Sequence, residues 1–350
     1  MALPLSVLDL TPRAAGASSG HSLRNTIDLG ELTDRLGYHR FWLAEHHNLA
    51  SIVSTAPEVM IGLVARATRG IRVGAGGIML PNHPPLRVAE NFRVLEALFP
   101  GRIDLGLGRA PGSDGRAALA LRRSVERVTG DEFPELLDEL LAFGAGKFPP
   151  DHPLTGVRAL PDDVALPPIW ILGSSDFGAR LAARRGFGFG FAHHFSAEWV
   201  LPASRAYREN FRPSNYRETP YMVLTVAAVC AETEEEADFL ASTLDLASVR
   251  RARGEFAPLS DPREAVKYPF SAAEHASVSN FRANIFVGAP ATVRAGIEKL
   301  ANATQADEVM VTTMLFDHGA RRHSYELLAR EFGLASRIAG DGRESARAAA

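Results

Sequence analysis

The stretch Tyr38–Gly112 decides the fold, and it reads YHRFWLAEHHNLASIVSTAPEVMIGLVARATRGIRVGAGGIMLPNHPPLRVAENFRVLEALFPGRIDLGLGRAPG. Three times, a short apolar run is followed by a loop and then by apolar residues at helical spacing, which predicts alternating strands and helices. Three polar or glycine-rich clusters, 45–47, 74–77 and 108–112, each follow a predicted strand. Because parallel strands present their carboxyl ends at one edge of a sheet, where ligands bind, these clusters predict a site at that edge.

The same alternation continues on both sides of this stretch and gives eight predicted strands. Eight strands alternating with helices, without a change of composition between the halves, favour one α/β domain, a (β/α)8 TIM barrel, over residues 1–335. A doubly wound open sheet is the alternative. We expect insertions after the fourth and seventh strands, at 110–130 and 247–286, and a disordered tail at 336–350. The predicted strands are 3–10, 39–44, 71–76, 102–107, 169–172, 188–192, 221–230 and 308–314.

The composition is that of an ordinary soluble globular protein, with 350 residues of which 46% are hydrophobic and 23% are charged. A net charge of −3 gives no basic footprint for nucleic acid or for an anionic membrane surface. No apolar run approaches the ~20 residues of a membrane span, and no signal peptide is visible, so a cytoplasmic protein is expected. The single cysteine, Cys230, excludes an internal disulfide and indicates a buried small hydrophobe.

Glu45-His46-His47 is the first candidate for chemistry. Neighbouring side chains on extended backbone point to opposite sides, so the two histidines are poorly placed to chelate one metal ion. A histidine that faces a pocket near pH 7 can act as acid, base or hydrogen-bond donor. The alternative is a satisfied polar cluster that closes the top of the barrel. His318 and His323 lie five residues apart, which fits no helical metal pair, and we assign no metal site.

The glycines at 74–77 do not form a dinucleotide fingerprint, because Met79 stands where the third glycine of G-x-G-x-x-G belongs. Glycines at this place let a planar ligand approach the backbone or allow an unusual peptide geometry. A tight turn from strand to helix is the alternative interpretation.

Arg109 and Ser174-Ser175 end two predicted strands that are neighbours in a barrel. The serines stand where a helix begins, so its free N–H groups and the hydroxyls are available to an anion. Arg109 could add a bidentate clamp on the same phosphate. Alternatively, Ser174 only caps the helix and Arg109 makes a surface ion pair. His193 ends another strand on the same edge, where it either lines the pocket or has a structural role.

Five stretches together resemble the bacterial luciferase-like flavin-dependent monooxygenases, in their non-luminous branch. The likeness runs from about residue 3 to residue 332, and the ordered set of motifs is more specific than any one of them. The resemblance implies the barrel fold and an enzyme that uses reduced FMN and O2 to transfer one oxygen atom to a small organic substrate. The stretches are 41–47, 71–81, 101–109, 171–175 and 307–313.

The resemblance also implies roles for single residues. His46 stands at the histidine associated with the flavin reaction, and Gly76-Gly77 at the pair that forms a non-prolyl cis peptide beneath the flavin ring. Arg109, Ser174 and Ser175 stand at phosphate-binding positions, and we place His193 with them among the cofactor-binding residues. Bacterial luciferase departs from this chain, since it has a reactive cysteine at the position of Gly108 and a tryptophan at that of His193, which argues against light emission.

We therefore expect a cytoplasmic homodimer that receives reduced FMN from a separate NAD(P)H:flavin reductase. The first alternative is an F420-dependent oxidoreductase that transfers hydride on the same barrel and needs no O2. The second is a non-catalytic flavin-binding or partner subunit.

Overall fold

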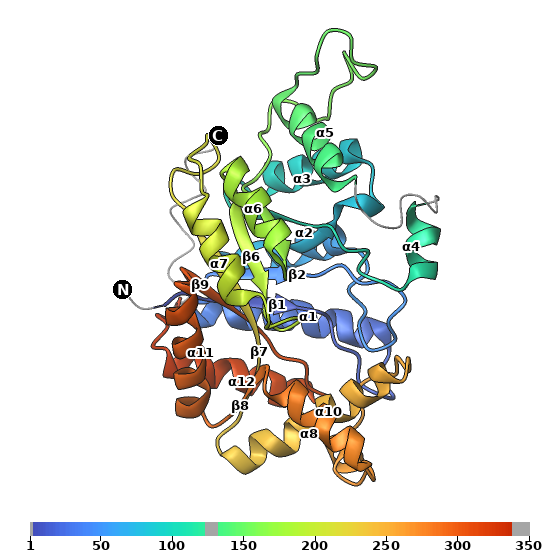
Figure 1. Ribbon diagram of the computed structural model, residues 1–350, viewed down its shortest axis with the longest axis vertical. Coiled ribbons are helices and arrows are strands. Elements are labelled where there is room, and N and C mark those ends of the chain that lie inside the picture. The colour runs from blue at the N-terminus through green and yellow to red at the C-terminus, as the bar shows by residue number, and fades with distance from the viewer. Residues whose placement is uncertain (1–2, 123–131, 338–350) are drawn as a thin grey trace.

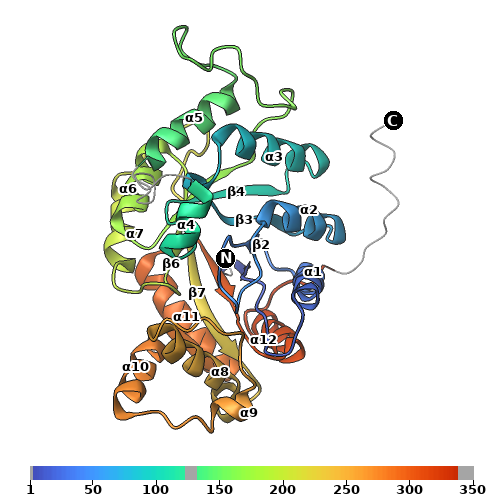
Figure 2. The same ribbon diagram turned by 90° about the vertical axis from the view of Figure 1, so that its right-hand side faces the viewer.

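A ring of parallel strands forms the centre of the molecule (Figures 1 and 2). The computed structural model describes residues 3–122 and 132–337, and within these ranges nine strands form one sheet. Neighbours follow the order β6-β5-β4-β3-β2-β1-β9-β7, and a further pairing of β6 with β7 closes the ring. The predicted (β/α)8 barrel is confirmed. The strands are β1 (Leu5–Asp9), β2 (Arg40–Leu43), β3 (Arg72–Met79), β4 (Ile103–Gly108), β5 (Ile169–Gly173), β6 (Gly188–Ala192), β7 (Met222–Cys230), β8 (Ile285–Gly288) and β9 (Glu308–Thr312).

Helices surround the ring and cover its outer face (Figure 2). Figures 1 and 2 place α5 and the loop 146–168 at one end of the molecule, and α8 and α10 at the other. The helices of the described ranges are α1 (Ser19–Leu36), α2 (Pro57–Ala67), α3 (Pro85–Leu98), α4 (Gly115–Arg122), α5 (Phe133–Ala145), α6 (Asp176–Arg185), α7 (Val200–Glu209), α8 (Glu234–Ala252), α9 (Pro262–Ala265), α10 (Ala272–Arg282), α11 (Pro290–Thr304) and α12 (His318–Glu331), with a 3-10 turn η1 at Leu80–Asn82.

The segment 247–286, which the sequence marks only by weak periodicity, contains more regular structure than expected. The end of α8, the helices α9 and α10 and the start of β8 all fall within it. β8 pairs in parallel with the end of β7 and stays outside the closed ring. A strand of four residues is too short for a pattern of alternating burial to identify it.

The first two residues of the predicted disordered tail make defined contacts. Ser336 donates a hydrogen bond to the carbonyl of Arg35, and Arg337 pairs with Asp34 at 2.8 Å. The side chain of Asp34 also accepts the N–H groups of Arg69 and Ile71, so these contacts tie the segment to the end of α1. Residues 338–350 of the tail, and 123–130 of the predicted insertion after β4, lie outside the described residues.

Alternation along β6 shows how the inside of the barrel is filled. Phe187, Phe189 and Phe191 are fully buried among the helices outside the ring. The glycines between them face inward, and a Cβ at Gly188 would lie 2.3 Å from the ring of Trp170. The interior therefore has room for a large indole only because β6 contributes no side chain there.

Buried charges close the amino end of the barrel. Arg40 donates to Asp104 at 2.8 Å and to Glu308 at 3.0 Å, and Arg72 reaches Asp104 at 2.7 Å. Both carboxylates are fully buried. Burial alone would raise the pKa of Asp104, but the charges of Arg40 and Arg72 outweigh it and hold this pKa below its usual value. Each charge in the network depends on its partners, because an unpaired buried ion is strongly unfavourable.

Removal of the Asp104 carboxylate tests this dependence. We expect Asp104→Ala to lower the free energy of unfolding by about 3–5 kcal/mol, since it removes the carboxylate partner of Arg72 and leaves Arg40 with Glu308 alone. Urea titration followed by circular dichroism measures the change. Asp162→Ala is the control, because Asp162 pairs with Arg158 on the surface and such pairs contribute about 0–1 kcal/mol. Equal effects of the two substitutions would contradict the structural role of the buried network.

Candidate functional site

The sequence suggested that the glycines at 74–77 follow a strand. In the structure they lie inside β3. β3 runs to Met79, and its register against β4 shifts between Ala75 and Ile78. The Gly76–Gly77 peptide is cis, as the resemblance implies. A Cβ at Gly76 would lie 2.7 Å from the side chain of Leu8, and a Cβ at Gly77 would lie 2.6 Å from the carbonyl oxygen of Gly106. Close packing on both sides of the strand therefore requires glycine at these two positions.

The Glu45-His46-His47 cluster divides into two parts with different environments. The carboxylate of Glu45 is fully buried and lies 2.8 Å from His47 Nε2 and 2.9 Å from His83 Nε2. It also accepts hydrogen bonds from the Asn82 amide and the Met79 N–H. Burial alone would raise the pKa of Glu45, but the hydrogen bonds from both histidines and from Met79 lower it to about 2. For Glu45 and His47, the satisfied polar cluster is the correct interpretation.

His46 is not part of this network. Its backbone N–H donates to the carbonyl of Ser54 at 2.8 Å, while the Nδ1 atom of its side chain is buried without a partner in the described chain. Burial lowers the pKa of His46 to about 4; the negative charge of Glu45 opposes this, and His47 and Arg251 add to it. The imidazole is therefore neutral at pH 7.

β2 and β6 stand opposite each other in the ring, so His46 and the pair His193-His194 approach the mouth from opposite sides. His193 is buried, and its Nδ1 atom has no partner among the described residues. Burial also lowers the pKa of His194 to about 4, partly offset by its hydrogen bond to Thr225, and the nearby His46 and His193 lower it further. His194 thus lies near both His46 and His193, and the ring of His193 stacks on that of Phe286 in β8, with 6.4 Å between their centroids. The sequence pointed to His46 and His193 but gave His194 no role of its own.

Arg109 lies beside the serines, as the neighbouring strands β4 and β5 require. Its guanidinium stacks over the ring of Phe177, 4.4 Å from the centroid, in the first turn of α6. Ser175 occupies the N-cap position of α6, but its side chain makes no capping hydrogen bond. Within the described ranges Arg109 has no ion pair. The alternative interpretation, a helix cap beside a surface ion pair, does not describe this arrangement.

His83 and Asn82 complete the site, and neither was predicted from the sequence. Asn82 donates to Glu45 and to the carbonyl of Pro111, and it accepts from Arg122 at 2.9 Å. Two adjacent polar residues directly before Pro84-Pro85 were the sequence feature that could have indicated them.

No cluster of three or more His, Cys, Asp or Glu in the described part of the chain could hold a metal ion. In the same part, no helix is long and apolar enough to cross a bilayer.

The sequence model of the luciferase-like monooxygenases matches residues 3–307. A luciferase-like monooxygenase of Escherichia coli K12 is 42% identical over 93% of this chain and 96% of its own. The N-acetyl-S-alkylcysteine monooxygenase of Bacillus subtilis is 32% identical over 93% of this chain and 97% of its own. Among solved structures, apo-MsnO8 superposes with a TM-score of 0.86 at 36% identity, over 96% of this chain and 100% of its own.

Structures of lower identity share the fold alone, and they differ in cofactor. The oxygenating constituent of 3,6-diketocamphane monooxygenase from Pseudomonas putida, in complex with FMN, has a TM-score of 0.68 at 20% identity, over 97% of this chain and 99% of its own. An F420-dependent secondary alcohol dehydrogenase has a TM-score of 0.63 at 15% identity, over 94% and 99%. The family model and the close relatives cover nearly all of the described residues. The chain therefore belongs to the luciferase-like monooxygenase family, a family of flavin-dependent enzymes.

Proposed function

We propose that this chain is an FMN-dependent monooxygenase that uses reduced FMN and O2 to oxygenate a small organic substrate. One observation carries the proposal: the Nδ1 atoms of His46 and His193 and the Oγ1 atom of Thr312 are buried without partners in the described chain. All three side chains stand at the carboxyl edge of the ring. Buried polar atoms are paired in nearly all native proteins, so unpaired atoms at this edge support a polar ligand there.

The residues present fit FMN at both of its ends. Arg109, Ser174 and Ser175 offer an anion a guanidinium, two hydroxyls and an uncapped helix start, which suits the phosphate. Gly76 and Gly77 stand where the resemblance places the peptide beneath the flavin ring. When bound in its reduced form, FMN would supply the electrons with which one atom of O2 is transferred. His193 would lie beside the ring.

His46 is the proposed catalytic residue. Because its imidazole is neutral at pH 7, one ring nitrogen donates a hydrogen bond while the other accepts a proton. Glu45 and His47, which are held by their own hydrogen bonds, fix the backbone on both sides of His46. His46 is thus placed to hold or move a proton at the reacting group, and its side chain is uncharged before that transfer.

The remaining parts of the proposal concern the partners. We propose that the enzyme works in the cytoplasm and receives reduced FMN from a separate NAD(P)H:flavin reductase. F420-dependent hydride transfer is the second candidate, because a dehydrogenase of that kind has the same fold. A non-catalytic flavin-binding subunit is disfavoured by the unpaired nitrogen of His46, which such a subunit has no need to keep.

Isotope labelling tests the proposed reaction. The full chain is supplied with reduced FMN, ¹⁸O2 and N-acetyl-S-methylcysteine, a probe chosen from the name of the Bacillus subtilis relative, and then with a broader set of organic compounds. We expect one ¹⁸O atom in an organic product. Turnover with reduced F420 in the absence of O2 would replace the proposal by its alternative.

A homodimer is proposed from an apolar strip on α2 and α3, which pack against each other. Val59 and Leu63 on α2 are 60% and 49% exposed, and Val94 and Leu98 on α3 are 47% and 65% exposed. Each pair is spaced by four residues, so it lies on one face of its helix. Adjacent exposed apolar side chains of this size are typical of a surface that binds a partner, here a second copy of the chain.

His46→Ala tests the catalytic residue. We expect FMN affinity to change by less than about threefold, since His46 does not hold the phosphate, and turnover to fall by about 10²–10⁴-fold, the usual effect of losing an acid-base group. With a pKa near 4, His46 also predicts no loss of activity around pH 6.5 in the wild type. His323→Ala on the exposed face of α12 is the control. Unchanged turnover in His46→Ala would remove His46 from the mechanism.

Arg109→Ala tests the phosphate clamp. We expect the dissociation constant of FMN to rise about 10–100-fold, the range for a lost hydrogen bond to a charged group, while that of riboflavin hardly changes. Fluorescence titration of both flavins measures the two constants. Arg180→Ala, which removes an exposed arginine paired with Asp176 on α6, is the matched control. Equal losses for FMN and riboflavin would show that Arg109 does not bind the phosphate.

The double substitution Leu63→Glu and Leu98→Glu tests the dimer. Charges in the apolar strip would repel a second copy, so we expect sedimentation velocity to show monomers where the wild type shows dimers. Val266→Glu, at another exposed apolar residue, is expected to leave the dimer intact. A wild type that sediments as a monomer at all concentrations contradicts the proposal.

A further inference from the structure

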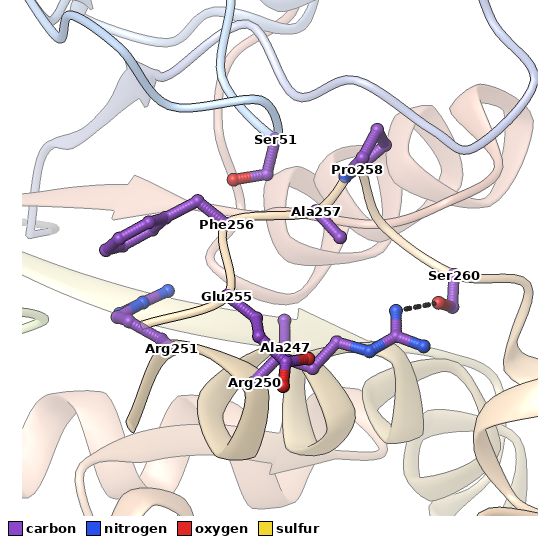
Figure 3. A pocket seen from close by; sticks show the side chains of 9 residues that line it. All are labelled: Ser51, Ala247, Arg250, Arg251, Glu255, Phe256, Ala257, Pro258 and Ser260. Carbon is purple, nitrogen blue, oxygen red and sulfur yellow. Dashed lines mark hydrogen bonds between the residues drawn. The ribbon is translucent and has the colours of Figure 1, made fainter. Parts of the chain in front are cut away.

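A small pocket lies at the mouth of the barrel, between the loop after β2 and the end of α8 (Figure 3). Ser51 lines it from the loop, Arg251 from α8, and Phe256 and Pro258 from the segment that follows α8. Its volume is about 20 Å³. A space of this size holds one or two water molecules, so it suits a small polar group of a ligand and not a whole substrate.

Backbone hydrogen bonds fix this pocket on the rim of the barrel. The N–H of Arg13, in the loop after β1, donates to the carbonyl of Ser51 at 2.9 Å. The N–H of Leu259 donates to the carbonyl of Arg13 at 2.9 Å, and Ala15 donates to Leu259 at 2.8 Å. The segment after α8 is therefore joined to the loops after β1 and β2, the second of which carries His46.

Three arginines stand at the end of α8, and only two of them have partners. Arg250 donates to the hydroxyl of Ser260 at 2.8 Å, and Arg253 forms an ion pair with Glu274. Arg251 has no hydrogen bond or ion pair from its side chain within the described ranges. Attraction to the carboxyl end of a helix is the ordinary reason for arginines at this place, but it applies to all three alike.

The position of Arg251 distinguishes it from its neighbours. Its side chain is exposed, yet burial by the surrounding walls lowers its pKa, which is the behaviour of a cation in a concave surface. Its charge is close enough to His46 to lower the pKa of that histidine. Glu255 also lines the pocket, but Figure 3 shows its side chain directed toward Ala247 and Arg250, and it forms no ion pair with Arg251 in the described chain.

The order of the strands places this cation across the mouth from the candidate phosphate site. Arg109 and Ser174 follow β4 and β5, and the ring positions opposite these are β9 and β1. The segment that borders the Arg251 pocket is joined to the loop after β1 through Leu259. A cofactor anchored at Arg109 would therefore leave Arg251, which lies near His46, available to a second anion.

We propose that Arg251 binds the carboxylate of the organic substrate and that the enzyme acts on small organic acids. The proposal rests on the proposed function, because it assigns a substrate class to the same mouth. A guanidinium pairs with a carboxylate through two parallel hydrogen bonds, and the apolar wall at Phe256 and Pro258 adjoins the remainder of the substrate. Recognition at a distance from the reacting atom orients the substrate toward His46.

Calorimetry with the full chain and saturating FMN tests the proposal without any turnover. The probes are N-acetyl-S-methylcysteine, which carries a carboxylate, and its neutral methyl ester. We expect the wild type to bind the acid at least about tenfold more tightly than the ester, and Arg251→Ala to bind both with equal weakness. Arg251→Lys is expected to recover part of the preference, since it keeps the charge but not the paired hydrogen bonds.

Arg253→Ala is the matched control, because it removes a charge from the same end of α8 while Arg251 stays in place. It should keep the preference for the acid. Three results would overturn the proposal: a wild type without this preference, a preference that persists in Arg251→Ala, or its loss in Arg253→Ala.

The affinity for FMN shows which anion Arg251 binds. If Arg251 binds the substrate, FMN affinity stays unchanged in Arg251→Ala. If Arg251 binds the phosphate, FMN affinity falls, and this result also overturns the proposal. Failure of the wild type to bind FMN would instead count against the proposed function.

Discussion

The buried carboxylate of Glu45 is the interaction on which the rest of the site depends. It joins the loop after β2 to the end of β3 and to η1, through His47, Met79, Asn82 and His83. Because one ionised group accepts hydrogen bonds from all of these residues, it fixes the three segments relative to one another. Its pKa near 2 keeps it charged at any ordinary pH. His46 needs no hydrogen bond of its own side chain to be held, because both of its neighbours are held.

The histidines and arginines of the mouth then have separate tasks. Burial without a counter-ion keeps His46 and His194 neutral, so the centre of the mouth has no fixed positive charge near pH 7. The cations stand at the edges, Arg109 beside α6 and Arg251 at the end of α8. Anionic groups are therefore attracted to the two sides, while the middle is left to the uncharged parts of the ligands.

The sequence predicted the parts of the fold that repeat. Alternating strands and helices predicted the closed barrel, and neighbouring strands predicted that Arg109 lies beside Ser174 and Ser175. Features that depend on contacts between distant segments were not predictable. No spacing marks Arg337 as a partner of Asp34, and β8 is too short to show a pattern. For the same reason Glu45 and His47 could not be separated from His46, since three adjacent polar residues look alike until their partners are known.

The two cations also belong to different kinds of structure. Arg109 directly follows a strand of the ring, where the position of each residue is set by the barrel itself. Arg251 lies on α8, in the set of added elements between β7 and β9, and contacts the ring through hydrogen bonds such as that between Leu259 and Arg13. If the proposed roles hold, a change in these added elements would replace the residue that binds the substrate without moving the residue that binds the flavin phosphate. Under the two proposals, the residue that recognises the substrate thus belongs to the added elements, and the residue that holds the cofactor belongs to the barrel itself.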